Sequence, residues 1–200
     1  MKKGFTLIEM LVVIGILAIL IAASLSAFSK MTRTAEMAKG REVVSNTATA
    51  LVALFQTDGS WPRSLRVNGA TDGELDARAA YPLSKGYMTL TTSGTQLSGM
   101  DRFGILTPWG SAHLKSRGNS AALGDKVGEG TLKDHILHYA LDLDGDGIIS
   151  GASVGGESVD VRANAIVWSV GPSGRVEGYS KGIKGDGIYS WTKGQTQSVK

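Results

Sequence analysis

The chain of 200 residues contains no cysteine, few prolines and, over its first quarter, almost no glycine. Without cysteine, an exported domain would have to be stabilised by its core or by a bound metal, because disulfides are excluded. The first of the 4 prolines is Pro62, and only 3 of the 27 glycines precede Asp58. These absences predict a continuous helix in the N-terminal part and concentrate turns and loops in the remainder.

Charge is absent from one long stretch near the N-terminus. The 19 residues from Met10 to Phe28 carry no charge, enough to cross a hydrocarbon layer of about 30 Å as a helix. Lys2 and Lys3 precede this stretch, and positive residues hold that end of a membrane helix in the cytoplasm. We expect one transmembrane helix over 5–28, with the following domain on the other side of the membrane.

An amphipathic helix over 29–57 continues the apolar segment, because apolar and charged residues are interleaved at helical spacing. Turn-forming residues beginning with Gly59 end it. The expected fold is α+β, with one long N-terminal helix packed on a small antiparallel sheet with long loops, in a globular domain over 58–200.

Strand-like runs of β-branched and aromatic residues mark the expected sheet. They occur at 87–92, 135–142, 163–170 and 187–191. The segment 58–82 reads as a loop with at most a short helical turn over 74–80, and 110–130 reads as loop throughout.

A cleavable signal peptide is the simplest interpretation of the first 28 residues, with a cleavage candidate at 25–27. Two features oppose it. The apolar run is longer than the core of an ordinary signal peptide, and Glu9 lies near its start. An ionisable residue in a membrane helix indicates a functional site and requires a cationic partner.

The segment Lys2-Lys3-Gly4-Phe5-Thr6-Leu7-Ile8-Glu9, followed by apolar residues, resembles the leader of type IV pilins and type II secretion pseudopilins. The resemblance implies that a prepilin peptidase removes residues 1–4 by cutting after Gly4 and methylates Phe5. It also implies that Glu9 pairs with the terminal amine of Phe5 in a neighbouring subunit. Such a pair cancels two charges in a low-dielectric helix bundle and fixes the register of the subunits.

Shorter similarities favour the major pseudopilin within this family. Thr107-Pro108-Trp109-Gly110 resembles its Asp-Pro-Trp-Gly loop, with Thr107 in place of the acid, and the segments 167–174 and 185–191 resemble its closing strand, glycine turn and C-terminal motif. The resemblance implies that calcium stabilises the C-terminal region, with Asp186 as a candidate ligand.

A calcium site is also indicated by the residues themselves. Asp142, Asp144 and Asp146 alternate around glycines, as in the first half of an EF-hand loop, and clustered carboxylates suit Ca²⁺. The twelfth position is Ser153 in place of the usual bidentate Glu, so a further ligand is expected from Glu157, Asp160 or Asp186. A solvated acidic turn without metal is the alternative.

No catalytic motif occurs, so we expect no enzymatic activity. The expected function is that of a structural subunit of a type II secretion pseudopilus that helps to move folded proteins across the outer membrane. Its expected partners are further copies of itself in a homopolymer, the prepilin peptidase, the inner-membrane assembly platform and minor pseudopilins. The subunit is expected to cross the inner membrane once, with its C-terminal domain in the periplasm, and the assembled filament to lie in the periplasm or at the cell surface.

A type IV or competence pilin used for adhesion, motility or DNA uptake is the alternative. Basic residues near the C-terminus suit phosphate contacts in that case: Arg175, Lys181, Lys184, Lys193 and Lys200. Acidic residues intervene and no aromatic residues are regularly interleaved, so nucleic-acid binding is not expected.

Overall fold

The computed structural model describes residues 6–67, 69–84, 103–182 and 185–197, without the side chains at 23, 25–27 and 29. The chain divides into two compact units, Met1–Ala38 and Lys39–Lys200. The strand expected at 87–92 lies outside the described residues.

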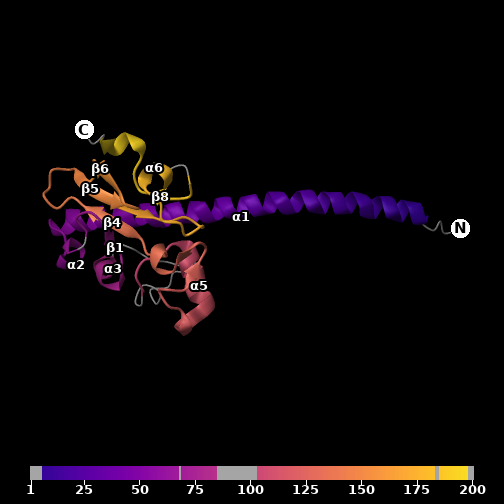
Figure 1. Ribbon diagram of the computed structural model, residues 1–200, viewed down its shortest axis with the longest axis horizontal. Helices are drawn as coiled ribbons and strands as arrows, with labels where there is room; N and C mark the ends of the chain where they lie inside the picture. The colour runs from indigo at the N-terminus through magenta and orange to yellow at the C-terminus, as the bar shows by residue number, and fades with distance from the viewer. Residues whose placement is uncertain (1–5, 68, 85–102, 183–184, 198–200) are drawn as a thin grey trace. The chain divides into compact units, whose positions relative to one another are not determined.

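Helix α1, Leu7–Asp58, is the first element and contains no proline (Figure 1). In the first unit its large apolar side chains, from Leu7 to Ile21, are exposed in the single chain. Over the part of the chain that the structure describes, no helical stretch combines the length and the apolar character of a membrane span.

Within the second unit, α1 is amphipathic, as its sequence predicts. Val44, Leu51 and Leu54 are buried, and the hydroxyl of the buried Thr47 donates to a carbonyl of the preceding turn. Gly40 allows a close approach, because a Cβ added there would lie 2.5 Å from Ile188 Cδ1 and 2.9 Å from Trp109 Cη2. This half of α1 therefore belongs to the core of the second unit.

An antiparallel sheet with the order β1-β4-β7-β8 is the main sheet of this unit. Its strands are β1 Gly73–Glu74, β4 His138–Leu141, β7 Ala165–Ser169 and β8 Ile188–Tyr189. All five residues of β7 are buried, which explains its continuous apolar run. The register pairs Leu141 with Ala165 at one end of β7 and Ser169 with Ile188 at the other.

Two smaller sheets complete the strand structure. One has the order β5-β6-β9, with β5 Ile149–Val154, β6 Glu157–Val161 and β9 Thr196–Gln197. The other is a hairpin of β2 Lys126–Val127 and β3 Gly130–Thr131. Irregular pairing between Ile149 and Ala152 interrupts the register of β5 with β6.

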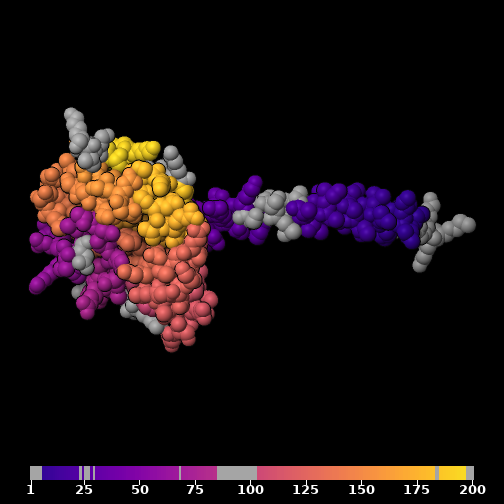
Figure 2. Space-filling view, viewed as in Figure 1, coloured from indigo at the N-terminus to yellow at the C-terminus, as the bar shows by residue number. Residues whose placement is uncertain are grey.

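Short helices connect these sheets. They are α2 Arg63–Arg66, α3 Ala77–Ser84, α5 Pro108–Arg117 and α6 Tyr179–Gly182, with 3-10 turns η1 Gly118–Ser120, η2 Lys133–His135 and η3 Lys193–Gln195. The space-filling view shows the α2–α3 region, the β5–β6 region and the α5 region meeting on one face of the second unit (Figure 2).

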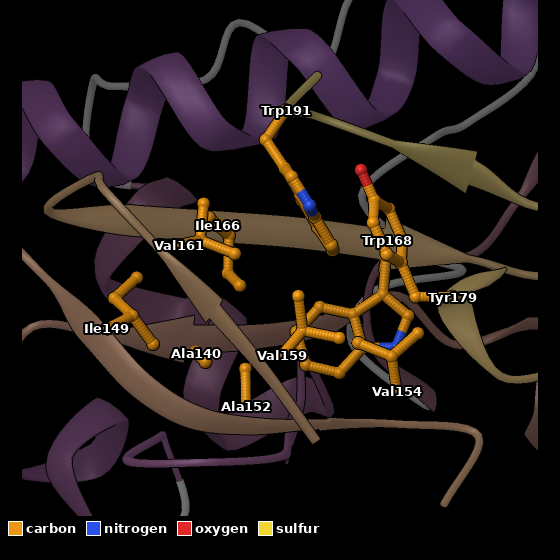
Figure 3. Packing of buried hydrophobic residues seen from close by; sticks show 10 residues of the cluster. All are labelled: Ala140, Ile149, Ala152, Val154, Val159, Val161, Ile166, Trp168, Tyr179 and Trp191. Carbon is orange, nitrogen blue, oxygen red and sulfur yellow. The ribbon is translucent and has the colours of Figure 1, made fainter. Parts of the chain in front are cut away.

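A buried cluster joins the two larger sheets. Strands β4 to β7 contribute small and β-branched residues to it, and Trp168, Tyr179 and Trp191 add large aromatic rings (Figure 3). Trp168 meets Trp191 edge to face at 6.0 Å between ring centroids, and Tyr179 stacks on Trp191 at 5.3 Å. The aromatic rings thus hold the C-terminal segment onto the sheets.

The observed α+β architecture confirms the expected fold class, with differences in detail. Strands β4, β7 and β8 lie within the expected runs, and η2 occupies the first residues of the run at 135–142. The expectation of loop over 110–130 was wrong, since α5, η1 and β2 occupy most of that segment. The helical turn expected over 74–80 is helix α3, and strands β5 and β6 were not anticipated.

Candidate functional site

The N-terminal site begins at the first turn of α1. Gly4 and Phe5, the expected processing residues, lie outside the described residues. Thr6 and Glu9 form reciprocal contacts: the backbone N–H and the hydroxyl of Thr6 each donate to Glu9 Oε2 at 2.8 Å, and the N–H of Glu9 donates to Thr6 Oγ1 at 3.3 Å. This arrangement is a capping box, which satisfies backbone donors that a helix start leaves free.

The capping box fixes where the Glu9 carboxylate lies. Oxygen Oε2 is held against the residue that directly follows Phe5 in the chain. A carboxylate at the start of a helix is also favoured by the helix dipole. The carboxylate is therefore positioned at the N-terminal end of the apolar segment within the single chain.

The acidic loop, residues 142–148, connects β4 to β5. Carboxylate oxygens of Asp142, Asp144 and Asp146 lie within 4.8 Å of one another, as their alternating positions predict. Asp142 is buried and the other two are exposed. Three hard oxygen donors within this distance have the chemistry that Ca²⁺ prefers.

Backbone hydrogen bonds shape the acidic loop. Both carboxylate oxygens of Asp142 accept backbone donors, Oδ1 from Gly145 at 2.7 Å and Oδ2 from Gly147 at 2.8 Å. Both glycines have φ of 81°, a conformation that other residues rarely adopt. The carboxylate of Asp142 therefore organises the turn, and Asp146 Oδ1 accepts the Ile148 N–H at 2.7 Å at its end.

The acidic loop is anchored to the end of α1 through Trp61. The indole N–H of Trp61 donates to the Asp142 carbonyl at 2.7 Å, and its ring stacks on Phe55 of α1 at 4.6 Å. The N–H of Asp142 donates to the Asn164 carbonyl at 2.9 Å, at the start of β7. The loop therefore has a fixed position relative to both the helix end and the sheet.

The additional ligands expected for this loop lie elsewhere. Asp160 accepts the Gly151 N–H at 2.7 Å, and Glu157 accepts the N–H and hydroxyl of Ser180. Asp186 directly precedes β8, and β8 pairs with the Ser169 end of β7. Asp142 adjoins the Ala165 end of β7, which lies about 15 Å away along the strand. The structure thus brings Asp142, Asp144 and Asp146 together but does not add Asp186 to them.

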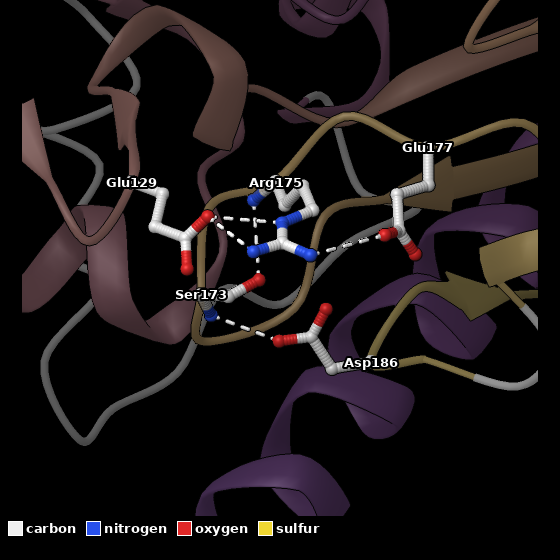
Figure 4. Close-up of polar contacts among 5 residues, drawn as sticks. All are labelled: Glu129, Ser173, Arg175, Glu177 and Asp186. Atoms are coloured by element: carbon white, nitrogen blue, oxygen red, sulfur yellow. Dashed lines mark hydrogen bonds and ion pairs between the residues drawn. The ribbon is translucent and has the colours of Figure 1, made fainter.

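Asp186 lies instead beside the turn over 171–175, shown in Figure 4. Its Oδ2 accepts the Ser173 N–H at 2.9 Å. The Arg175 guanidinium contacts Glu129 Oε2 at 2.6 Å and Glu177 Oε1 at 3.6 Å. The positive charge of Arg175 thus already lies between the carboxylates of Glu129 and Glu177. These ion pairs are exposed, so each contributes little to stability by itself.

The segment resembling the pseudopilin Asp-Pro-Trp-Gly loop begins helix α5. Thr107 is the N-cap residue, with its hydroxyl accepting the Gly110 N–H at 3.2 Å, and Pro108 follows at the first helical position. The Thr107 hydroxyl also lies 2.8 Å from Nδ1 of the fully buried His135, whose Nε2 lies 3.3 Å from the Val127 carbonyl. These contacts assign the Nε2–H tautomer, with Thr107 donating to Nδ1.

Comparison with known proteins identifies a family motif at the N-terminus and relatives that match part of the chain. Residues 1–25 match the family described as the prokaryotic N-terminal methylation motif. The chain is 26% identical to the type IV major pilin protein PilE1 of Neisseria gonorrhoeae over 114 residues, 55% of this chain and 63% of that protein. It is 27% identical to a fimbrial protein of Neisseria meningitidis over 112 residues, 54% of this chain and 66% of that protein.

A second fimbrial protein of Neisseria meningitidis is 32% identical over 79 residues, which cover 39% of this chain and 46% of that protein. The chain thus spans about half to two-thirds of the length of the curated relatives it matches. No solved structure matches the chain significantly.

Proposed function

We propose that this chain, a homologue of type IV pilins with the N-terminal methylation motif of the pilin and pseudopilin family, is a structural filament subunit of a type II secretion pseudopilus. The observation that carries the proposal is the position of Glu9. A single carboxylate is held by a capping box at the start of the apolar segment of α1, within the matched motif. Polymerisation gives this carboxylate a role that a simple membrane anchor does not.

In the proposed pathway, prepilin peptidase cuts after Gly4 and methylates the new terminal residue Phe5. The apolar segment of α1 holds the subunit in the inner membrane, with the globular unit in the periplasm. During assembly, the helix leaves the membrane and packs against the helices of other copies. The terminal amine of one copy then neutralises Glu9 of another, so neither charge remains buried alone.

The pseudopilus is preferred over a surface pilus for two reasons. The chain has no cysteine, so the C-terminal disulfide found in many type IV pilins cannot form. The segment 107–110 resembles a loop of the major pseudopilin in sequence, and here it begins a helix whose cap contacts the buried His135. A type IV or competence pilin is the second candidate, favoured by the names of the Neisseria relatives.

Calcium binding is a further part of the proposal. The acidic loop supplies three carboxylates within 4.8 Å, and Trp61 ties its backbone to the end of α1. A bound Ca²⁺ would neutralise the repulsion among these carboxylates and rigidify the loop. Asp142, Asp144 and Asp146 would hold it, with water or backbone carbonyls completing the ligand set.

Mass spectrometry of the mature N-terminus, with protein from native membranes, tests the proposed class first. The expected chain begins with N-methylated Phe5. A chain that begins at Phe28, or one that retains Met1, would contradict processing by prepilin peptidase. Deletion of the gene then separates the two filament types: loss of protein secretion supports the pseudopilus, and loss of adhesion or DNA uptake supports the pilus.

A substitution separates the two roles of Glu9. Glu9→Gln retains an amide oxygen for the capping box but removes the charge. We expect normal processing and greatly reduced filament assembly, because the terminal amine loses its counter-charge. Thr6→Ser, which retains the hydroxyl and the charge, serves as the control. Normal filaments from Glu9→Gln in cells without a wild-type copy would refute the pairing.

A further inference from the structure

A cavity of about 230 Å³ lies beside strand β8, apart from the sites described above. Its wall combines aromatic and basic side chains, contributed by Arg41, Tyr179, Tyr189, Trp191 and Lys193. No acidic residue in the described part of the chain lines it. We call it the aromatic cavity.

Among the described residues, no carboxylate lies within ion-pair distance of either cation of the aromatic cavity. Both cations, Arg41 and Lys193, are exposed. Two positive side chains at the wall of one hollow create a positive potential that attracts an anionic group.

Two buried polar atoms also belong to residues of this wall. Tyr179 and Trp191 are 6% and 5% exposed, and their polar atoms Tyr179 Oη and Trp191 Nε1 are shielded from solvent. Burial raises the pKa of the Tyr179 hydroxyl, although a hydrogen bond with the neighbouring Trp191 side chain lowers it, so the phenol keeps its proton. A carboxylate at the mouth of the cavity would offer countercharge to the two exposed cations, and an apolar side chain beside it would pack against the aromatic rings.

An anionic surface of suitable chemistry lies on the same unit. Asp58 is exposed at the C-terminus of α1, where the helix dipole disfavours an acid and no basic residue occurs in the last turn. In the acidic loop, Leu143 is 40% exposed between the carboxylates, and Asp144 and Asp146 are exposed. We call Asp58, Leu143, Asp144 and Asp146 the acidic end.

The acidic end and the aromatic cavity lie at opposite ends of the second unit. Arg41 and Asp58 are separated by 17 residues of α1, which is about 25 Å along the helix axis. The sheet agrees with this separation, because the acidic loop adjoins the start of β7 and the cavity adjoins β8, which pairs with the end of β7. Within one copy the two surfaces are too far apart to touch, but the acidic end of one copy can contact the aromatic cavity of another.

We propose that the acidic end of one copy, with no calcium in its loop, docks in the aromatic cavity of the next copy. Leu143 packs against the aromatic side chains, and Asp144 and Asp146 meet Arg41 and Lys193. The contact joins two different surfaces of identical chains, an arrangement that generates an open filament when the rotation between copies does not close a ring. The proposal rests on the proposed function as a filament subunit and identifies a contact between its globular units.

Cysteine cross-linking in the full chain tests this contact, since the natural sequence has no cysteine. Cells producing Leu143→Cys and Thr192→Cys copies together are oxidised with a chelator present, so that no calcium alters the charge of the loop. A disulfide requires Cα atoms within about 7 Å, so only a close approach gives cross-linked dimers. Leu123→Cys, 38% exposed on another surface, replaces Leu143→Cys in the control pair.

We expect several-fold more cross-linked dimer from the Leu143 and Thr192 pair than from the control pair. Arg41→Glu and Lys193→Glu in the Thr192→Cys copy should reduce the yield of cross-linked dimer. Adding Asp144→Lys and Asp146→Lys to the Leu143→Cys copy should restore this yield. Restoration also shows that the reversed variants are folded.

Filaments that form normally while this pair cross-links no better than the control would overturn the docking contact alone. A loss of cross-linking on charge reversal that the swapped charges do not restore would also overturn the docking contact. Absence of both filaments and N-terminal processing in the wild-type chain would instead refute the proposed function, so the two failures are distinguishable.

Discussion

Replacing Thr107 by Val should destabilise the second unit through two buried groups at once. The Thr107 hydroxyl caps α5 by accepting the Gly110 N–H and donates to His135 Nδ1. Loss of an N-cap costs about 0.5–2 kcal/mol, and leaving a buried hydrogen-bonding group unsatisfied costs about 1–3 kcal/mol. Together they predict a loss of about 2–4 kcal/mol in the free energy of unfolding, while Val keeps nearly the same side-chain volume.

Urea denaturation of the full chain in detergent, followed by tryptophan fluorescence, measures this loss. Thr107→Ser is the matched control, because it keeps the hydroxyl and removes one methyl group, worth about 1 kcal/mol. Hydrogen exchange should also quicken at Gly110 in Thr107→Val only. Equal losses for Val and Ser, or a Val variant within about 0.5 kcal/mol of wild type, would refute the hydrogen-bonding account.

The same contact predicts how stability depends on pH. Burial lowers the pKa of His135, an effect that His113 increases and that the Val127 carbonyl, Asp134 and Asp186 oppose. The unfolded chain therefore binds a proton before the folded chain does, so stability falls as pH drops below about 6.5. Thr107→Asp should weaken this dependence, because a carboxylate beside Nδ1 favours the imidazolium.

Three further predictions concern the other sites. Asp144→Asn with Asp146→Asn should lower the thermal midpoint measured in calcium to its value in chelator; equal wild-type midpoints in both would remove calcium from the proposal. Gly40→Ala should destabilise the chain by about 1–3 kcal/mol despite the better helix propensity of Ala, because the added Cβ would overlap the side chains of Ile188 and Trp109. Gly15→Ala is the control without this loss of stability, because a Cβ added at Gly15 meets no atom within 4 Å. Trp61→Phe should cost about 1–3 kcal/mol and speed hydrogen exchange in the acidic loop, since a buried carbonyl loses its donor; unchanged exchange there would contradict the anchoring role.

Elements with strong local signals were predictable from the sequence. Helix α1 has a long run of helix-forming residues without proline, and β7 has an unbroken apolar run that is buried throughout. Strand β5 contains Ser, Gly and Ala and is interrupted at Gly151, which has φ of 71°. Its conformation depends on pairing with β6, so local composition favoured a loop.

Helix α5 was missed because it has little amphipathic pattern and begins with Pro and Trp. Its start signal was nevertheless present, since Thr followed by Pro is typical of an N-cap and a first helical position.

The candidate sites also differ in whether neighbouring residues in the sequence or distant strand pairing determine their geometry. The alternating positions of Asp142, Asp144 and Asp146 predict their clustering, because the glycines of one short turn bring them together. The position of Asp186 depends on the end of β7 with which the adjacent strand β8 pairs. The spacing of residues in the sequence does not predict that pairing. The capping box of Thr6 and Glu9 was missed although the Thr-x-x-Glu spacing is a readable signature.

The short outer strands of the main sheet affect how copies of this chain can associate. Strands β1 and β8 each contribute only two residues to its edges. Long exposed edges invite strand addition from neighbouring molecules and lead to irreversible aggregation. The main sheet therefore offers little edge for strand addition, and contacts between copies through side chains and helices leave it intact. Subunits joined in that way can separate and be reused without the rupture of a shared sheet.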